Sequence, residues 1–395
     1  MRCAVKRIEA DAGRLFLVLL LLALQGCGTL SIKPHVPSPT PGEAYKVGEV
    51  VDLATGERVT FQEMIRDLEA ARVVYVGETH VSRADHALQL KVARALLERH
   101  PQLAIGVEMV PRTLQPVLDR WVKGLLSEEE LLEELAWEET WGHDFALYRP
   151  LFQLTRDHRL PMVALNAPGD LVRKVARDGL AGLDARERSQ LAVRFLDDDP
   201  RHRAFVEEEF RSHAHGGFEN FQHFYEAQLA WDETMAETLA QWLRDHADFQ
   251  VLVLAGKGHV NYRFGVPERT KRRLEHRYAI VVPMPVHDTA LQVSPEIGDY
   301  LVVTEKERPF PGHGLRLGIV LDREKTESGL YVKAVLPGSR AARSGLKPGD
   351  RIVAVDGRTI GDIRELHEVV RGGGGRRTFT VERRGNRTDV VIDLD

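Results

Sequence analysis

Histidines and carboxylates follow apolar runs at several points of this chain, in an order that could support proton transfer or metal binding. Gly77-Glu78-Thr79-His80 follows the run 73–76, Glu108 follows 103–107, and Gly256-Lys257-Gly258-His259 follows 251–254. The form Gly-x-x-His therefore occurs twice. Imidazoles bind metals and exchange protons near neutral pH, and carboxylates do either. We take Glu78, His80, Glu108 and His259 as the candidate catalytic residues.

The elements around these residues predict an α/β fold. Short apolar strands are expected at 73–76, 103–107, 162–165, 251–254 and 278–282. Helical patterns are expected at 84–99, 111–123, 127–137, 144–158, 169–178, 185–196, 202–211 and 219–246. Apolar strands alternating with helices indicate a mostly parallel sheet flanked by helices on both faces. Ligands bind beyond the carboxyl ends of such strands, so we expect the four side chains to share one cleft. Any one of them alone would more simply cap a helix or bind a backbone group.

The residue types leave the chemistry of the cleft open. In a hydrolase, Glu78 would be the base, and His80, Glu108 and His259 would hold a divalent metal or polarise the substrate. The two cysteines, Cys3 and Cys27, both lie near the N-terminus, so we expect no thiolate site or disulfide framework in the mature fold. No nucleotide-binding glycine loop or Gly-x-Ser-x-Gly elbow follows a strand.

The first 27 residues predict a lipoprotein signal peptide. Basic residues precede an apolar run at 15–24, which is too short to span a bilayer, and the run ends at Leu24-Gln25-Gly26-Cys27. This order resembles the lipobox of bacterial lipoproteins, so Cys27 is the expected lipidation site; a secretory signal cleaved nearby is the alternative. Residues 28–45 are rich in Pro, Ser and Thr and indicate a flexible tether. We expect a lipid-anchored protein of the cell envelope, on the outer membrane or the periplasmic face of the inner membrane.

Several motifs together resemble the ChaN family of the haem-binding uptake/Tiki superfamily. They are Val76-Gly77-Glu78-Thr79-His80, Val107-Glu108-Met109, Leu165-Asn166-Ala167-Pro168 and Ala255-Gly256-Lys257-Gly258-His259-Val260. The segments 141–152 and 228–236 (Gln-Leu-Ala-Trp-Asp-Glu-Thr-Met-Ala) extend the resemblance. It implies a ChaN-like α/β domain over 46–300.

The resemblance implies haem as the cofactor, with iron acquisition as the role. Tyr148 and His143 are then the candidate haem-binding residues, beside the aromatic side chains Trp137, Trp141, Phe145 and Phe152. A second aromatic stretch holds His213, His215, His223 and Tyr225. Relatives of the Tiki and erythromycin-esterase type imply the alternative, a metal-dependent hydrolase with His80, Glu108 and His259 as metal ligands. A non-catalytic envelope scaffold is the third reading.

The C-terminal part, 312–395, resembles a PDZ domain with a small β-sandwich-like fold. Arg316-Leu317-Gly318-Ile319 is similar to the loop that binds a peptide carboxylate, and strands, turns and a short helix follow in the PDZ order. Leu317, Gly318, Ile319 and Ile363 are the candidate peptide-binding residues. Expected partners are haem or another small ligand, peptide C-termini or a partner protein, and a membrane through the anchor. A homodimer is a further expected partner arrangement. The net charge of -5 and the absence of a basic, aromatic-rich cluster in the large domain argue against nucleic acid.

Overall fold

A computed structural model describes residues 45–212, 220–286, 294–306, 317–321, 329–335, 339–361 and 375–394, together with Glu365, Leu366 and Val369. Cys27, residues 28–44 of the expected tether, His213, His215 and Ile363 lie outside the described residues, while Tyr45, the last tether residue, is buried. None of the helices in the described part of the chain combines the length and the apolar character that crossing a membrane requires.

The larger domain is built on one eight-stranded sheet with the order β2-β1-β8-β7-β3-β6-β4-β5. Its strands are β1 (Val50–Asp52), β2 (Arg58–Val59), β3 (Val73–Glu78), β4 (Leu103–Pro111), β5 (Met162–Asn166), β6 (Gln250–Gly256), β7 (Tyr278–Pro285) and β8 (Tyr300–Thr304). The six strands from β8 to β5 pair with one another in parallel, and β1 pairs antiparallel with both β8 and β2. The expected mostly parallel sheet is confirmed. The antiparallel edge was not expected, since β1 and β2 are too short to leave an apolar run.

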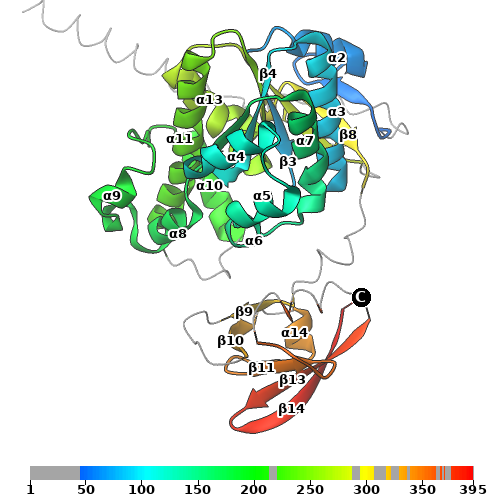
Figure 1. Ribbon diagram of the computed structural model, residues 1–395, viewed down its shortest axis with the longest axis vertical. Helices are drawn as coiled ribbons and strands as arrows, with labels where there is room; N and C mark the ends of the chain where they lie inside the picture. The colour runs from blue at the N-terminus through cyan, green and yellow to red at the C-terminus, as the bar shows by residue number, and fades with distance from the viewer. Residues whose placement is uncertain are drawn as a thin grey trace, which may run out of the picture.

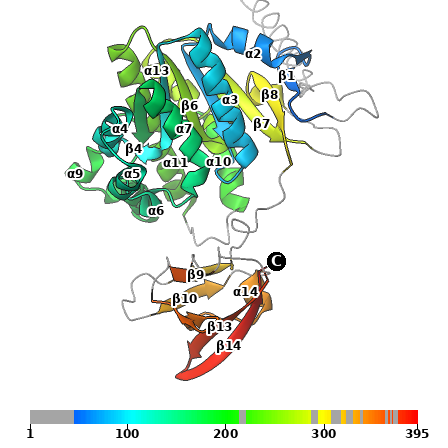
Figure 2. The same cartoon turned by 45° about the vertical axis from the view of Figure 1, so that its right-hand side comes forward.

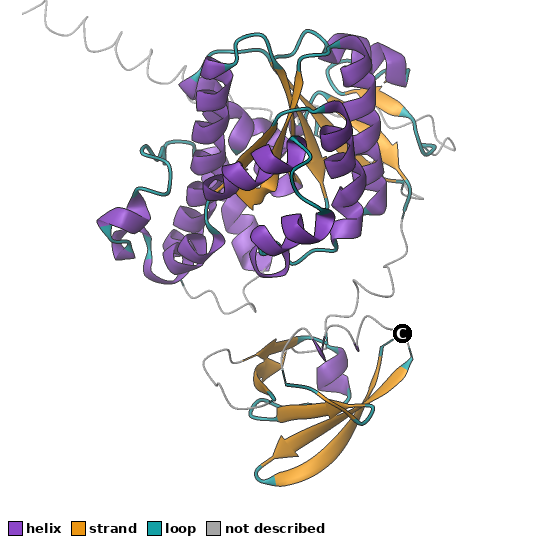
Figure 3. Cartoon of the chain, viewed as in Figure 1, coloured by secondary structure: helices purple, strands orange, loops and turns teal. Residues whose placement is uncertain are grey.

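Helices cover both faces of this sheet (Figures 1 and 3). They are α2 (Phe61–Leu68), α3 (Arg83–Arg99), α4 (Gln115–Val122), α5 (Glu128–Glu134), α6 (Trp137–Thr140), α7 (Phe145–His158), α8 (Gly169–Asp178), α9 (Ala185–Arg188), α10 (Pro200–Ser212), α11 (Phe221–Asp245), α12 (Lys257–Val260) and α13 (Val266–Arg273). Successive strand side chains point to opposite faces. Val74 and Val76 join one core with Phe152 of α7, and Val73 and Tyr75 join the other with Leu239 of α11. Figure 2 shows α3 in front of the sheet, beside β7 and β8.

One helix prediction is wrong. The apolar periodicity of 185–196 predicts a helix, but α9 ends at Arg188 and the segment 189–199 is irregular. Side chains of α11 take the backbone N–H groups that a helix would use. Ala192 N–H donates to Thr234 Oγ1 over 3.0 Å, and Leu196 N–H donates to Glu233 Oε1 over 2.9 Å. Tertiary contacts therefore override the local helical pattern.

The C-terminal domain has a separate sheet with the order β14-β13-β11-β10-β9, and β12 pairs with β11. Its elements are β9 (Ile319–Leu321), β10 (Leu330–Val335), α14 (Arg340–Arg343), β11 (Arg351–Val355), β12 (Arg358–Thr359), β13 (Arg376–Arg383) and β14 (Asn386–Asp393). All the described pairings in it are antiparallel. A core of its own includes Ile352 and Phe379. This is the small antiparallel domain that the sequence predicts.

Candidate functional site

The ends of three neighbouring strands bring the predicted site residues together. β6 lies between β3 and β4, and Glu78 at the end of β3 is in register with Gly256 at the end of β6. Glu108 of β4 reaches across to β6, where its Oε2 accepts a hydrogen bond from Gly256 N–H over 2.5 Å. His259 follows on α12 and places its Nε2 3.3 Å from Glu108 Oε1. Glu78, His80, Glu108 and His259 therefore form one cluster, as expected.

Glu78 is a buried carboxylate that holds His80 and Tyr148 by hydrogen bonds. Its side chain is fully buried, and its Oε1 accepts hydrogen bonds from His80 Nδ1 over 2.9 Å and from the Tyr148 hydroxyl over 3.0 Å. Gln89 Nε2 donates to Oε2 over 2.8 Å. Burial alone would raise the pKa of Glu78, but the hydrogen bond from His80 and the nearby imidazoles hold it below its usual range. Glu78 is thus a charged support for His80.

His80 is the exposed member of the cluster. Its side chain is 32% exposed, and its ring packs edge-on against Trp141 with the centroids 4.8 Å apart. The ring of His143 lies 5.1 Å away. Burial opposes protonation, yet the hydrogen bond to Glu78 and the charge of Glu108 raise the pKa of His80. We call His80, Trp141 and His143 the rim cluster.

Tyr148 does not belong to the rim cluster. Only 2% of its surface is exposed, and its hydroxyl donates to Glu78. Burial, together with the charge of Glu78, raises its pKa above the ordinary value. The hydroxyl would have to leave Glu78 before it could reach an iron, so its predicted role as a haem ligand stays untested.

His259 lies between two carboxylates in the second half of the cluster. Its Nδ1 is 2.7 Å from Asp232 Oδ1, and its Nε2 faces Glu108. Burial disfavours the charged ring, but Glu108 and Asp232 raise the pKa of His259 to about 10. Burial opposes the charge of Glu108 as well, yet His259 lowers the pKa of that carboxyl to about 2. The two carboxylates therefore favour the charged form of His259, and the Gln228 amide nitrogen lies 3.1 Å from its Nδ1.

Two glycines let the backbone approach these rings. A Cβ on Gly256 would lie 2.8 Å from His80 Cε1 and 3.5 Å from Glu108 Oε2. A Cβ on Gly265 would lie 2.2 Å from the backbone oxygen of His259 and 3.1 Å from Asp232 Oδ1. The absence of a side chain at both positions is a steric requirement of the site.

Asp232 is the site residue that sequence reasoning missed. It lies on α11, far along the chain from its partner, and it is fully buried. Burial opposes its charge, but His259 and His202 hold its pKa below the usual range. The available signal was its position in the motif 228–236. An acidic residue inside an otherwise buried helix needs a partner.

The donor arrangement does not suit a metal as it stands. Among the described residues, no group of three or more His, Cys, Asp or Glu side chains is placed to hold a metal ion. Both nitrogens of His259 face carboxylates, so neither offers a lone pair. The assignment of His80, Glu108 and His259 as metal ligands stays a prediction.

Comparison with known proteins identifies the family. The model of the family described as "Haem-binding uptake, Tiki superfamily, ChaN" matches residues 64–270, which is more than half of the chain. The chain belongs to the ChaN family. A second family model, of the PDZ domain, matches residues 331–383, so the protein joins a ChaN domain to a PDZ domain.

Two curated relatives each match a part of the chain. The chain is 24% identical over 269 residues to Protein RETICULATA-RELATED 5, chloroplastic, of Arabidopsis thaliana, over 61% of this chain and 34% of that protein. It is 31% identical over 86 residues to the serine protease Do-like HtrA of Lactobacillus helveticus, over 21% of this chain and 20% of that protein. The chain thus matches about a third or less of the length of these curated relatives.

A solved structure supports the ChaN fold. The structure described as cofacial heme binding to ChaN of Campylobacter jejuni matches with a TM-score of 0.53 and 19% identity. The match covers 67% of this chain and 99% of that one. At this identity the likeness concerns the fold alone.

The predicted peptide-binding loop lies at the start of the PDZ sheet. Leu317 is buried, and its carbonyl accepts from Ala341 N–H over 2.9 Å. Gly318 has φ +75, and a Cβ there would lie 2.1 Å from Ser339 Cβ. Ile319 begins β9, which is the last strand of its sheet among the described residues. The loop therefore leads into an edge strand, as addition of a peptide strand requires.

Proposed function

We propose that this protein binds haem at the rim cluster of its ChaN domain, as a lipid-anchored envelope protein in haem or iron handling. The observation that carries the proposal is the state of His80. This imidazole is partly exposed, its Nδ1 is held by the buried Glu78, and its ring lies beside Trp141. Family membership supports haem as the ligand.

The residue types of the rim cluster suit an iron porphyrin. An imidazole that ligates a metal usually donates its other N–H to a carboxylate, which fixes the ring and raises its basicity. His80 has this arrangement. Trp141 and His143 add aromatic surface next to it, which suits a flat apolar macrocycle. We therefore assign the iron to His80, with His143 as a second candidate ligand.

Titration with hemin tests the proposal. The chain beginning at residue 28 would be titrated with hemin while the Soret absorption is recorded, and the expected stoichiometry is one haem per chain, in a monomer or a dimer. We expect saturable binding, and an increase in Kd of about tenfold or more in His80→Ala, since about 1.4 kcal/mol corresponds to a factor of ten. His143→Ala should weaken binding less.

The comparison variant is Tyr148→Phe, which removes the hydroxyl that donates to Glu78 and lies 3.3 Å from the His80 backbone oxygen, and which tests Tyr148 as the alternative ligand. Equal hemin affinity in the wild type and His80→Ala would contradict the assignment of His80. A loss of binding in Tyr148→Phe alone would move the iron ligand to Tyr148. No saturable spectral change in the wild type would reject the haem proposal.

A metal-dependent hydrolase remains the second candidate, because Glu78, His80, Glu108 and His259 converge on one strand edge. This candidate requires His259 to release at least one carboxylate. It would be favoured by a divalent metal that co-purifies with the wild type and is lost in His259→Ala, together with a failed hemin titration.

The PDZ domain and the anchor complete the proposal. We propose that the loop at Gly318 and the edge strand β9 receive the C-terminal peptide of a partner. We also propose that Cys27 carries the lipid. Mass spectrometry of the membrane fraction would test this, since Cys27→Ser should lack the lipid and leave that fraction.

A further inference from the structure

Asp232 lies between two imidazoles behind the site. Its Oδ1 is 2.7 Å from His259 Nδ1, and its Oδ2 is 3.3 Å from Nε2 of His202, a residue of α10. The side chains of Asp232 and His202 are 0% and 1% exposed. A carboxylate has two oxygens, so its orientation towards His259 depends on the groups that face Oδ2, which are His202 and the Gln228 amide, whose Nε2 donates to it over 3.3 Å.

The proton of His202 can be placed from its neighbours. Arg269 Nη2 lies 3.0 Å from His202 Nδ1, and a guanidinium only donates hydrogen bonds. His202 Nδ1 therefore accepts from Arg269, with the Tyr225 hydroxyl also 3.2 Å away, and this places a ring proton on Nε2. Among the described residues Nε2 forms no hydrogen bond, and Asp232 Oδ2 is the oxygen within ion-pair distance of it. The N–H of His202 thus faces Asp232.

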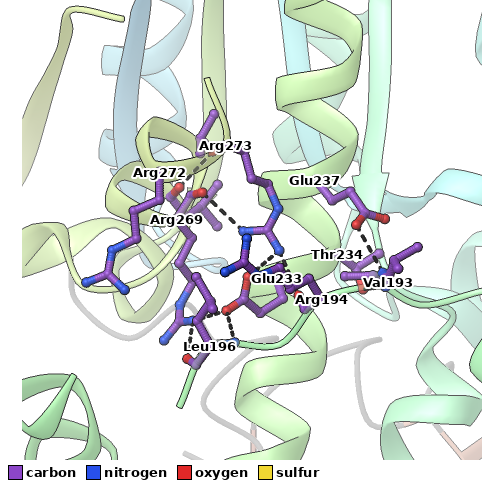
Figure 4. Close-up of polar contacts among 12 residues, drawn as sticks. Val193, Arg194, Leu196, Glu233, Thr234, Glu237, Arg269, Arg272 and Arg273 are labelled. Atoms are coloured by element: carbon purple, nitrogen blue, oxygen red, sulfur yellow. Dashed lines mark hydrogen bonds and ion pairs between the residues drawn. The ribbon is translucent and has the colours of Figure 1, made fainter. Parts of the chain in front are cut away.

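Arg269 is in turn fixed by a buried ionic cluster, drawn in Figure 4. Its Nη1 donates to the Leu196 carbonyl over 2.8 Å and also to the Glu233 carboxylate. Arg273 pairs with the other Glu233 oxygen. Glu233 is fully buried, and it adjoins Asp232 on α11. Removing one member would leave a buried charge unpaired, which is costly, so Arg269 has little freedom to leave His202.

We propose that His202 is a positioning residue of the ChaN site: its Nε2–H faces Asp232 and holds the carboxylate that orients His259. His202 is fully buried and cannot touch a ligand, so it acts through Asp232. The consequence for ligand binding rests on the proposed function, because His259 contacts Glu108 next to His80. The effect of His202 on the orientation of His259 does not rest on the proposed function.

Nuclear magnetic resonance of the chain beginning at residue 28, with 15N-labelled histidine, tests the proposal. The proton of a short hydrogen bond to a buried carboxylate should resonate far downfield, and His259→Asn would identify the signal of His259 Nδ1–H. We expect His202→Phe to shift this signal upfield or broaden it beyond detection. Phe keeps a ring beside Tyr225, so most of the packing is retained. His202→Gln, which keeps an N–H donor, should restore the signal.

Glu237→Gln is the matched control. Glu237 binds Val193 N–H in the same region but contacts neither His202 nor Asp232, so the signal should not change. An unchanged signal in His202→Phe overturns the proposal. If His202→Phe does not fold, His202→Ala and His202→Gln decide: loss in Ala with recovery in Gln supports the proposal, and retention in Ala overturns it.

Hemin titration of the same variants separates the two proposals. We expect Kd to rise about tenfold in His202→Phe, as for other residues that orient a ligand-binding side chain. Failure of the wild type to bind hemin would refute the proposed function, while the resonance of His259 would still decide the role of His202.

Discussion

At the residue scale, the pairing of His259 with Glu108 makes stability depend on pH. Folding raises the pKa of His259 from 6.5 to about 10. Its contribution to the free energy of unfolding is therefore complete below pH 6.5 and is lost as the pH rises towards 10. Folding lowers the pKa of Glu108 from 4.5 to about 2. Its contribution to the free energy of unfolding is therefore complete above pH 4.5 and is lost as the pH falls towards 2. Both contributions are complete only between these unfolded values.

We therefore expect the wild type to exceed His259→Asn in free energy of unfolding most strongly between pH 4.5 and 6.5, with a smaller difference on either side. Urea unfolding of both proteins across the pH range would measure this. His158→Asn, a change at an exposed helix residue, is the control and should show only a small difference. A difference between His259→Asn and the wild type that does not vary with pH would mean that His259 is neutral in the folded state.

Four of the site residues could be predicted from the sequence alone. Glu78, His80, Glu108 and His259 could be found because each follows an apolar strand, and polar residues at strand ends are conspicuous. Asp232 left only the weak signal of an acidic residue in the motif 228–236, and His202 left none, because both lie on helices and the contact of Asp232 with His259 follows from tertiary packing.

At the element scale, the close passage of the chain at Gly265 beside His259 and α11 is a steric constraint. Gly265→Ala would place a methyl group 2.2 Å from a backbone oxygen, which cannot rotate away. We expect a loss in free energy of unfolding of about 1–3 kcal/mol, the usual cost of overpacking. Thermal or urea unfolding measures it.

Gly258→Ala is the matched control, seven residues earlier, since a Cβ there meets nothing within 4 Å. It should change the stability by less than about 1 kcal/mol, because Ala is the better helix former and no contact is made. Equal stability of Gly265→Ala and the wild type would show that the segment after α12 can move away from the site.

The strands were largely predictable at this scale, and their order was not. Apolar runs mark β3 to β7, because strands buried on both faces need continuous apolar sequence. That β6 separates β3 from β4 is a property of the sheet topology, and it is what places Gly256 between Glu78 and Glu108. The segment 189–199 was assigned wrongly because its backbone partners come from α11.

At the scale of the whole molecule, the ChaN and PDZ domains have separate cores, so their binding functions should be separable. Gly318→Ala would place a methyl group 2.1 Å from Ser339 Cβ, at a backbone φ of +75 that disfavours a side chain. We expect this change to weaken binding of C-terminal peptides about tenfold or more, while hemin affinity stays within about twofold.

Fluorescence titration with a peptide library, beside hemin titration, would measure both affinities, and His80→Ala should show the opposite pattern. Gly361→Ala, at a PDZ position where the nearest atom to a Cβ is 3.4 Å away, is the control for peptide binding. Loss of both functions in Gly318→Ala would mean that the two domains depend on each other.

Electron paramagnetic resonance of the ferric haem complex would show whether His80 of the ChaN domain binds the iron. With 15N-labelled histidine we predict nuclear coupling from an axial imidazole in the wild type, absent in His80→Ala and retained in Tyr148→Phe. The contrary result is a tyrosinate-type high-spin signal without imidazole coupling. If Tyr148→Phe abolished this signal and His80→Ala left it unchanged, ligation of the iron by His80 would be contradicted.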